Sequence, residues 1–419
     1  MDSAPGRPSA SPVSARLRLA VVVWAVLVSQ VLLYPGLDGL LVALGAPGSV
    51  SAGMWFLVAE YGAFVACAVV WGAASDALGR RAPLVVAGAL GGAASYLLLA
   101  SLPALGVGFA GVLVVRVLGG AFTIGAFSLG ITMLMDLAGG NGRNMGAAGI
   151  AIGLGAALGS VVGGQLSALS PFAPVYAGAA MLAAAGAVAA TVGETAGSTA
   201  DEPAGRDDAD ASDRRGLGAA VDTLRGRPAL GIPFAFGFVD RLTAGFFSLV
   251  GVFYFGDGFG LDAAGVGIAL ALFFLPFALL QYPLGSLSDR IGRFVPVVAG
   301  SVSYGLTIIA VGLASTVEVA MGLMALVGVA GAFVAPATMA LVTDLVDPAE
   351  RGVAMGGFNV FGSLGFLAGF LIGGVVGSSA DYLTAFLVVG GLEIAIAVVA
   401  LPAVRRLAAT GRQSVSAAD

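Results

Sequence analysis

Long apolar runs separated by short polar segments dominate this chain of 419 residues. Each run is close to the about 20 residues that cross a bilayer as a helix. The pattern therefore predicts an all-α integral membrane protein with twelve transmembrane helices. The predicted spans are residues 19–44, 54–74, 83–102, 104–135, 146–168, 172–192, 229–255, 263–284, 295–314, 317–343, 353–377 and 382–403.

The segment between the sixth and seventh runs differs from the rest of the chain. Residues 194–227 contain eight acidic residues and five arginines without apolar periodicity, which is typical of a solvated linker. We predict that it joins two six-helix bundles. The predicted divisions are an N-terminal tail (1–18), a first bundle (19–193), the linker (194–228), a second bundle (229–404) and a C-terminal tail (405–419).

The basic residues are distributed unevenly. All 19 of them are arginines, and 17 lie in the tails, in the linker or in alternate connections between spans. The remaining connections carry acidic residues but no basic residue. The positive-inside rule then places both termini and the linker in the cytoplasm, in a multi-pass protein of the cell membrane.

The composition limits the classes of function. Charged residues make up 10% of the chain, far below the about 25% of an average soluble domain. The sequence contains no phosphate-binding loop, no cluster of metal ligands and no nucleophile beside a base, so we expect no enzyme activity, metal or cofactor. Histidine is absent, so a proton transported near neutral pH must be carried by a carboxylate.

The two halves of the chain repeat each other. Segment 72–81 (GAASDALGRR) recurs as 285–293 (GSLSDRIGR), and its aspartate is displaced by 213 residues. Asp136 recurs as Asp344 at an offset of 208, and the glycines of the fifth span recur in the eleventh at an offset of 210. In transporters built from such repeats, the substrate path lies between the halves near the membrane midplane.

These motifs resemble those of the major facilitator superfamily over essentially the whole chain apart from the N-terminal tail and the linker. Segment 72–81 is similar to the family's signature between helices 2 and 3, with Ala77 in place of a basic residue that the second copy keeps as Arg290. Arg116 followed by Gly120 resembles the fourth-helix motif of proton-coupled members. The resemblance implies a fold of two pseudo-symmetric six-helix bundles, most like that of 12-helix drug/proton antiporters.

The two copies of the loop predict a cytoplasmic gate. A short turn can bring a carboxylate to the positive end of a neighbouring helix, while guanidinium groups pair with acids in contacts that form and break as the halves move. A basic loop that only sets the topology is the alternative. The predicted gate residues are Asp76, Arg80, Arg81, Asp136, Asp289, Arg290, Arg293 and Asp344.

Six charged residues lie well inside predicted spans, away from their ends, where charge is costly and usually functional. We expect Glu60 and Arg116 to share a polar pocket, with Glu60 or Asp38 alternating at Arg116 as protons bind and leave. A static buried ion pair is the alternative. We also expect a kink before Asp38, which follows Pro35 and Gly36. The predicted coupling and substrate-cavity residues are Asp38, Glu60, Arg116, Asp240, Arg241 and Glu393.

The adjacent residues Asp240 and Arg241 are about 100° apart around a helix, so they point to different neighbours. Phenylalanines around them suggest a cavity for an amphiphilic substrate, although core packing is the better interpretation for each one alone. These aromatic residues are Phe234, Phe238, Phe246 and Phe247.

The fifth span carries glycines on one helix face, which predicts close helix packing. They are Gly155, Gly159, Gly163 and Gly164. The run resembles the family's antiporter motif. Ser160, however, stands where drug/proton antiporters commonly carry proline, and this leaves the direction of transport open.

Together these features predict a monomeric secondary transporter that works by alternating access in the lipid bilayer and is driven by an ion gradient rather than by a cofactor. Proton-coupled export of a small amphiphilic molecule is the favoured function. The alternatives are a proton- or sodium-coupled symporter that imports a sugar, organic anion or other nutrient, and a non-transporting membrane sensor on the same scaffold. We expect no nucleic-acid partner.

Overall fold

The computed structural model describes residues 12–137, 141–192, 217–347 and 350–416, and over these ranges its regular structure is entirely helical. Twelve of the helices in the described ranges are long and apolar enough to cross a membrane, which confirms the predicted fold class. The first half contains α1 (Pro12–Val31), α2 (Leu37–Ala43), α3 (Val50–Leu78), α4 (Ala82–Ser101), α5 (Phe109–Met135), α6 (Asn141–Leu169) and α7 (Ala173–Thr191). The second half contains α10 (Gly231–Phe246), its π-helical continuations η3 (Phe247–Gly251) and η4 (Tyr254–Gly258), α11 (Ala263–Ile291), η5 (Val295–Ala299), α12 (Gly300–Gly312), α13 (Val317–Asp344), α14 (Arg351–Ser379) and α15 (Tyr382–Ser416).

The first predicted span, 19–44, is two helices rather than one. Helix α1 ends at Val31, a turn follows, and α2 begins at Leu37. Pro35 has no N–H to donate within a helix, and Gly36 lowers the helical preference further. The expected kink is therefore a complete break, and Asp38 lies in a separate short helix.

The structure differs from the predicted divisions at three places. Helix α1 begins at Pro12 inside the predicted N-terminal tail, and α15 continues beyond residue 404. The predicted linker contains a further helix, α9 (Leu217–Gly226), which packs against α14. Apolar residues at 217, 221 and 224 have helical spacing, so the expectation of no periodicity was wrong for this end of the linker.

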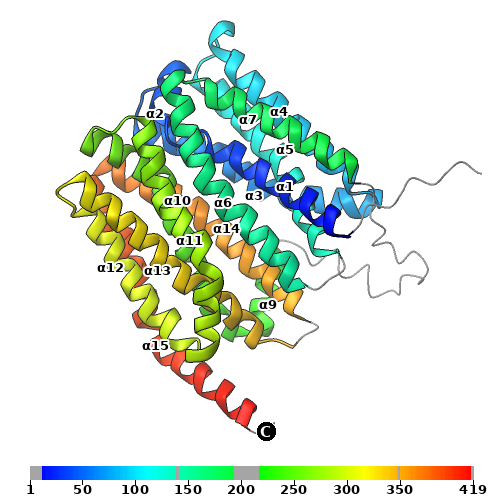
Figure 1. Cartoon of the computed structure of the whole chain (residues 1–419), viewed down its shortest axis with the longest axis vertical. Coiled ribbons are helices and arrows are strands. Elements are labelled where there is room, and N and C mark those ends of the chain that lie inside the picture. The colour runs from blue at the N-terminus through cyan, green and yellow to red at the C-terminus, as the bar shows by residue number, and fades with distance from the viewer. Residues whose placement is uncertain (1–11, 138–140, 193–216, 348–349, 417–419) are drawn as a thin grey trace, which may run out of the picture.

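The two halves form two bundles whose internal packing repeats (Figure 1). The pairs α3 with α5, α4 with α7 and α1 with α6 correspond to α11 with α13, α12 with α15 and α10 with α14. Between the bundles, α6 packs against α11 and α3 packs against α14, and these two contacts are also counterparts. This pattern confirms the prediction of two pseudo-symmetric six-helix bundles.

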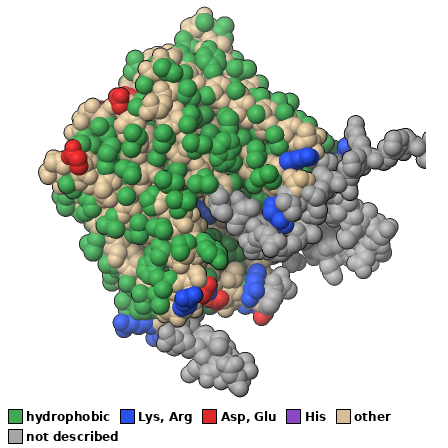
Figure 2. Space-filling model, in the orientation of Figure 1, with side chains coloured by type: hydrophobic (Ala, Val, Ile, Leu, Met, Phe, Trp, Pro, Cys, Tyr) green, Lys and Arg blue, Asp and Glu red, His purple; other side chains and the backbone are tan. Residues whose placement is uncertain are grey.

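The two ends of the molecule differ in charge. We call the end with the α3–α4 and α11–α12 loops the linker face. The opposite end, with α2 and the α6–α7 loop, is the distal face. In Figure 2 arginine atoms lie around the linker face, whereas the visible charged patches toward the distal face are acidic. This distribution is the one that the positive-inside argument requires.

The bundles meet closely at the distal face. A Cβ at Gly164 of α6 would overlap the backbone of Ala263, at the start of α11. A Cβ at Gly374 of α14 would overlap the side chain of Met54, near the start of α3. Small residues here let the two bundles approach each other, so the distal face is closed in this conformation.

Candidate functional site

The centre of the first bundle contains a buried ion pair between α3 and α5. Arg116 Nη2 donates a hydrogen bond to Glu60 Oε2, and the two residues are only 1% and 3% exposed. The guanidinium carbon lies 4.1 Å from the centre of the Phe56 ring, a distance suited to a cation–π contact. Across the described residues, neither Glu60 Oε1 nor Arg116 Nε has a hydrogen-bond partner. The pair is therefore enclosed but only partly hydrogen-bonded.

Gly120 explains how α3 and α5 come close enough for this pair. It lies one turn after Arg116, and a Cβ there would overlap the backbone carbonyl of Glu60. Any larger residue would push α5 away from α3 and separate the two charges. The arginine and the glycine of the motif therefore serve one geometric purpose.

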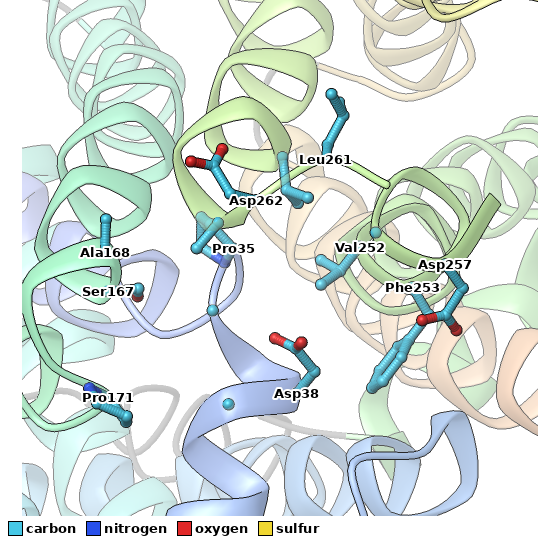
Figure 3. A pocket seen from close by; sticks show the side chains of 15 residues that line it. Pro35, Asp38, Ser167, Ala168, Pro171, Val252, Phe253, Asp257, Leu261 and Asp262 are labelled. Atoms are coloured by element: carbon cyan, nitrogen blue, oxygen red, sulfur yellow. The ribbon is translucent and has the colours of Figure 1, made fainter. Parts of the chain in front are cut away.

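Asp38 lies elsewhere, so the expectation that it alternates with Glu60 at Arg116 is not supported by this arrangement. The break after α1 places Asp38 in the first turn of α2, where it is exposed at the distal face. Its carboxylate points into a pocket of about 240 Å³ between the bundles (Figure 3). Arg116, by contrast, is enclosed within the first bundle by Glu60 and Phe56.

Two more acidic residues line this distal pocket, and both have structural partners. Asp257 accepts a hydrogen bond of 2.5 Å from the Tyr382 hydroxyl. Asp262 caps α11 by accepting a bond of 2.8 Å from the backbone N–H of Gly265. No group of three or more acidic or cysteine side chains in the described ranges is arranged to hold a metal ion.

An aromatic cluster joins the two bundles on the other side of α3. Tyr61 stacks on Phe366 of α14 with ring centres 4.8 Å apart, and Phe370 contacts its edge at 5.9 Å. On the second bundle, Arg241 Nη2 donates a hydrogen bond of 3.1 Å to Asn359 Oδ1, and Arg241 interacts electrostatically with Tyr61. Aromatic faces, a guanidinium group and an amide therefore meet at the interface between the bundles.

Sequence reasoning missed Tyr61, Phe366 and Asn359, because nothing in a single apolar span shows which of its faces meets the other bundle. It did separate Asp240 from Arg241 correctly: Arg241 points to α14, and Asp240 lies near Glu393 of α15. The neighbouring phenylalanines of α10 are mostly core residues. Phe234, Phe246 and Phe247 are almost fully buried against other aromatic rings.

The two gate loops share one backbone feature. Gly79 ends α3 with φ of +61°, and Gly292 ends α11 with φ of +87°. The N–H of each glycine bonds the carbonyl four residues earlier, in Ser75 and Ser288. Glycine takes this left-handed conformation without strain, so both helices can end in a tight turn that presents the following arginines.

The loop arginines pair with aspartates at the ends of α5 and α13. Arg81 forms an ion pair with Asp136, and Arg293 bonds Asp289 at 2.5 Å and Asp344 at 3.1 Å. Burial lowers the pKa of Arg293, but its hydrogen bonds to the two aspartates outweigh this and raise the pKa. The pairs with Asp136 and Asp344 connect elements of the same bundle, whereas the pair with Asp289 is local to the end of α11.

The remaining predicted gate residues lie beside these pairs. Asp76 is in the last turns of α3, and both it and Arg80 interact with neighbouring groups. Arg290 is exposed near the end of α11. The repeat offset matches Arg293 with Arg80, and in the first copy the next arginine, Arg81, contacts Asp136.

The glycines of α6 and α14 have corresponding neighbours. A Cβ at Gly155 or Gly159 would contact α1, one at Gly163 would overlap Leu32 directly after α1, and Gly164 faces the second bundle at Ala263. In α14 the corresponding first three glycines face α10, and the fourth faces Met54 of the first bundle. The ladders therefore pack each helix against its own bundle and against the opposite one.

Comparison with known proteins extends this description. The sequence profile of the Major Facilitator Superfamily matches residues 19–256 and 234–418. The chain is 27% identical to the tetracycline resistance protein, class C, of Escherichia coli over 381 residues, which is 90% of this chain and 92% of that protein. The crystal structure of the nucleoside transporter NupG has a similar fold, with a TM-score of 0.71, 16% identity and coverage of 93% of this chain and 98% of that one. The D-xylose-proton symporter is also similar, with a TM-score of 0.68, 15% identity and coverage of 91% and 96%.

Proposed function

The chain belongs to the major facilitator superfamily, and we propose that it exports a small, partly apolar compound in exchange for protons. It is a multi-pass membrane transporter and not an enzyme. The observation that carries the proposal is the buried Glu60–Arg116 ion pair. When the pair opens, the Glu60 carboxylate loses its guanidinium partner, and a proton can take its place.

The pair can couple protons through the cost of burying charge. A buried carboxylate is tolerated when a guanidinium group is hydrogen-bonded to it, and removing one partner from such a pair costs about 3–5 kcal/mol. If helix movement separates Arg116 from Glu60, a proton that binds Glu60 neutralises its carboxylate. The cost of burying that negative charge without a partner is then removed. Reforming the pair releases that proton. Each conformational cycle then binds and releases one proton at Glu60.

The interface between the bundles supplies a suitable substrate path. Tyr61 and Phe366 offer flat apolar surfaces, while Arg241 and Asn359 offer hydrogen-bond donors beside them. An amphiphilic molecule with a ring system and polar substituents matches this combination. The relative named for tetracycline resistance supports the same class of compound, since export is one way in which a membrane transporter confers drug resistance.

Alternating access requires that the contacts at the two ends change in turn. In this structure the distal face is closed by contacts such as Gly164 with Ala263. We propose that the linker face, with its loops and both termini, is cytoplasmic, and that the gate residues rearrange when the distal face opens. The transporter acts as a monomer in the lipid bilayer and uses no cofactor other than the ion gradient.

Accumulation of fluorescent amphiphiles and of tetracycline in cells tests the proposal. Cells with the wild-type protein should accumulate less of at least one compound than cells without it, and a protonophore should remove the difference. Arg116→Ala should do the same, whereas Arg225→Ala, a change at an exposed arginine, should not. Greater accumulation that depends on the gradient would overturn export in favour of import. Import would agree with Ser160, which stands where drug/proton antiporters commonly carry proline.

A further inference from the structure

The second bundle contains a separate group of buried polar atoms without partners. Glu393 of α15 is 1% exposed, and across the described part of the chain neither of its carboxylate oxygens has a hydrogen-bond partner. The same holds for Asp240 Oδ1, for the Ser301 hydroxyl and for the Tyr304 hydroxyl. Most of the unsatisfied buried side-chain atoms of the described residues therefore come from this one cluster.

These side chains come from three helices, two of which cross closely at glycines. Asp240 is on α10, Ser301 and Tyr304 are on α12, and Glu393 is on α15. Gly305 of α12 packs against the side chain of Glu393 and the backbone of α15, so the helices cross closely at this point. Asp240, Glu393 and Tyr304 interact electrostatically with one another.

The cation beside this cluster is Arg241, which attracts Asp240 electrostatically but donates its hydrogen bond elsewhere. Its titratable members are two carboxyl groups and one tyrosine hydroxyl, and Arg241 is the charged neighbour on α10. The guanidinium group of Arg241 instead donates a hydrogen bond to Asn359, on α14. The hydroxyls of Thr243 and Ser301 lie beside the Glu393 carboxylate, but Thr243 donates its hydrogen bond to the carbonyl of Val239.

Glu393, which is buried with both carboxyl oxygens unpartnered, and Asp240, whose Oδ1 is unpartnered, cannot both be ionised in this place. An isolated buried charge costs many kcal/mol, and such a group becomes neutral instead. When two carboxyl groups share one site, one of them keeps its proton. A protonated carboxyl group also becomes a donor, which the surrounding unpartnered oxygen atoms can accept.

We propose that Asp240, Glu393 and Tyr304 form a proton-binding site in the second bundle, distinct from the Glu60–Arg116 pair of the first. Asp240 is only partly buried and neighbours Arg241 at the interface between the bundles. The proton therefore passes between the interface and Glu393 through Asp240. The role of this site in the transport cycle rests on the proton coupling proposed above. Its protonation at neutral pH is independent of that proposal.

Infrared spectroscopy of the reconstituted protein tests this site without any substrate. In sodium-free buffer at neutral pH, the wild type should show the carbonyl stretching band of a protonated carboxyl group. The band should be lost in Asp240→Asn/Glu393→Gln and retained in Asp257→Asn, an acid of the distal pocket. The amide substitutions keep the shape of a neutral carboxyl group, so the double variant should fold.

Two results would overturn the proposal. One is a wild-type spectrum at neutral pH that matches the spectrum of the double variant. The other is a band that disappears when sodium chloride is added, since that would make the cluster a sodium site. If the double variant does not fold, wild type and Glu393→Gln are compared instead, and an unchanged band in Glu393→Gln refutes the site. A normal band with no gradient-driven export would refute only the proposed function, and export without the band would refute only this site.

Discussion

Separating the partners of the Glu60–Arg116 pair should be far more damaging than removing both. In Glu60→Gln the Arg116 guanidinium stays buried without a counter-charge, and in Arg116→Gln the carboxylate does. Each single change should cost about 3–5 kcal/mol, whereas two neutral side chains of similar volume at these positions cost much less. The coupling energy between the two positions should therefore be several kcal/mol.

Thermal unfolding of the four proteins in the same detergent measures this coupling. A chain with bundles of this size should lose about 2 °C in its unfolding midpoint per kcal/mol. Each single variant should then unfold roughly 6–10 °C below the wild type. The double variant should recover most of the loss, and Asp222→Asn, which removes only a solvent-exposed ion pair with Arg225, should leave the midpoint nearly unchanged.

The reasoning is refuted if the effects of the two single changes simply add in the double variant. Additivity would mean that the two side chains do not depend on each other, and that the ion pair is not present in the membrane. It would also remove the physical basis for proton coupling at Glu60, since an unpaired carboxylate would have no partner to exchange with a proton.

Three further predictions follow from the packing and the gates. Gly369→Val should destabilise the contact of α14 with α10 by about 1–3 kcal/mol, whereas Gly356→Ala, on the same helix but next to open space, should not lower the unfolding midpoint. In a variant without the native cysteine, Val50→Cys with Gly377→Cys should form a disulfide on oxidation. The disulfide should keep the distal face closed and stop transport until it is reduced. Continued transport by the cross-linked protein would show that this face does not open. Asp76→Ala should lose most transport activity while the amount of folded protein in membranes stays the same, and normal activity would exclude a gating role for this aspartate.

Much of the fold follows from the sequence because membrane helices are long and their repeats are regular. Apolar runs of fixed minimum length identify the spans, and the arginine distribution separates the two faces. Glu60 and Arg116 stand out because a charge inside a span needs a partner, and each is the charged residue of its helix core. Their contact in the structure satisfies that need.

Other features could not be predicted, for identifiable reasons. Helices α3 and α5 are apolar on all sides, so hydropathy does not show which face of each is buried. The contact of Tyr61 with Phe366 depends on that rotation. The position of Asp38 depends on a complete helix break, which Pro35 permits but does not require.

The most direct test of the account compares two modes of transport in liposomes that contain either the wild type or the Glu60→Gln/Arg116→Gln variant. For a compound found in the accumulation assay, the wild type should both follow an imposed pH gradient and exchange labelled for unlabelled compound. The variant should retain exchange but lose its response to the gradient, because its bundles still move but no carboxylate binds the proton at this site. Gradient-driven transport at the wild-type rate in the variant would contradict the account.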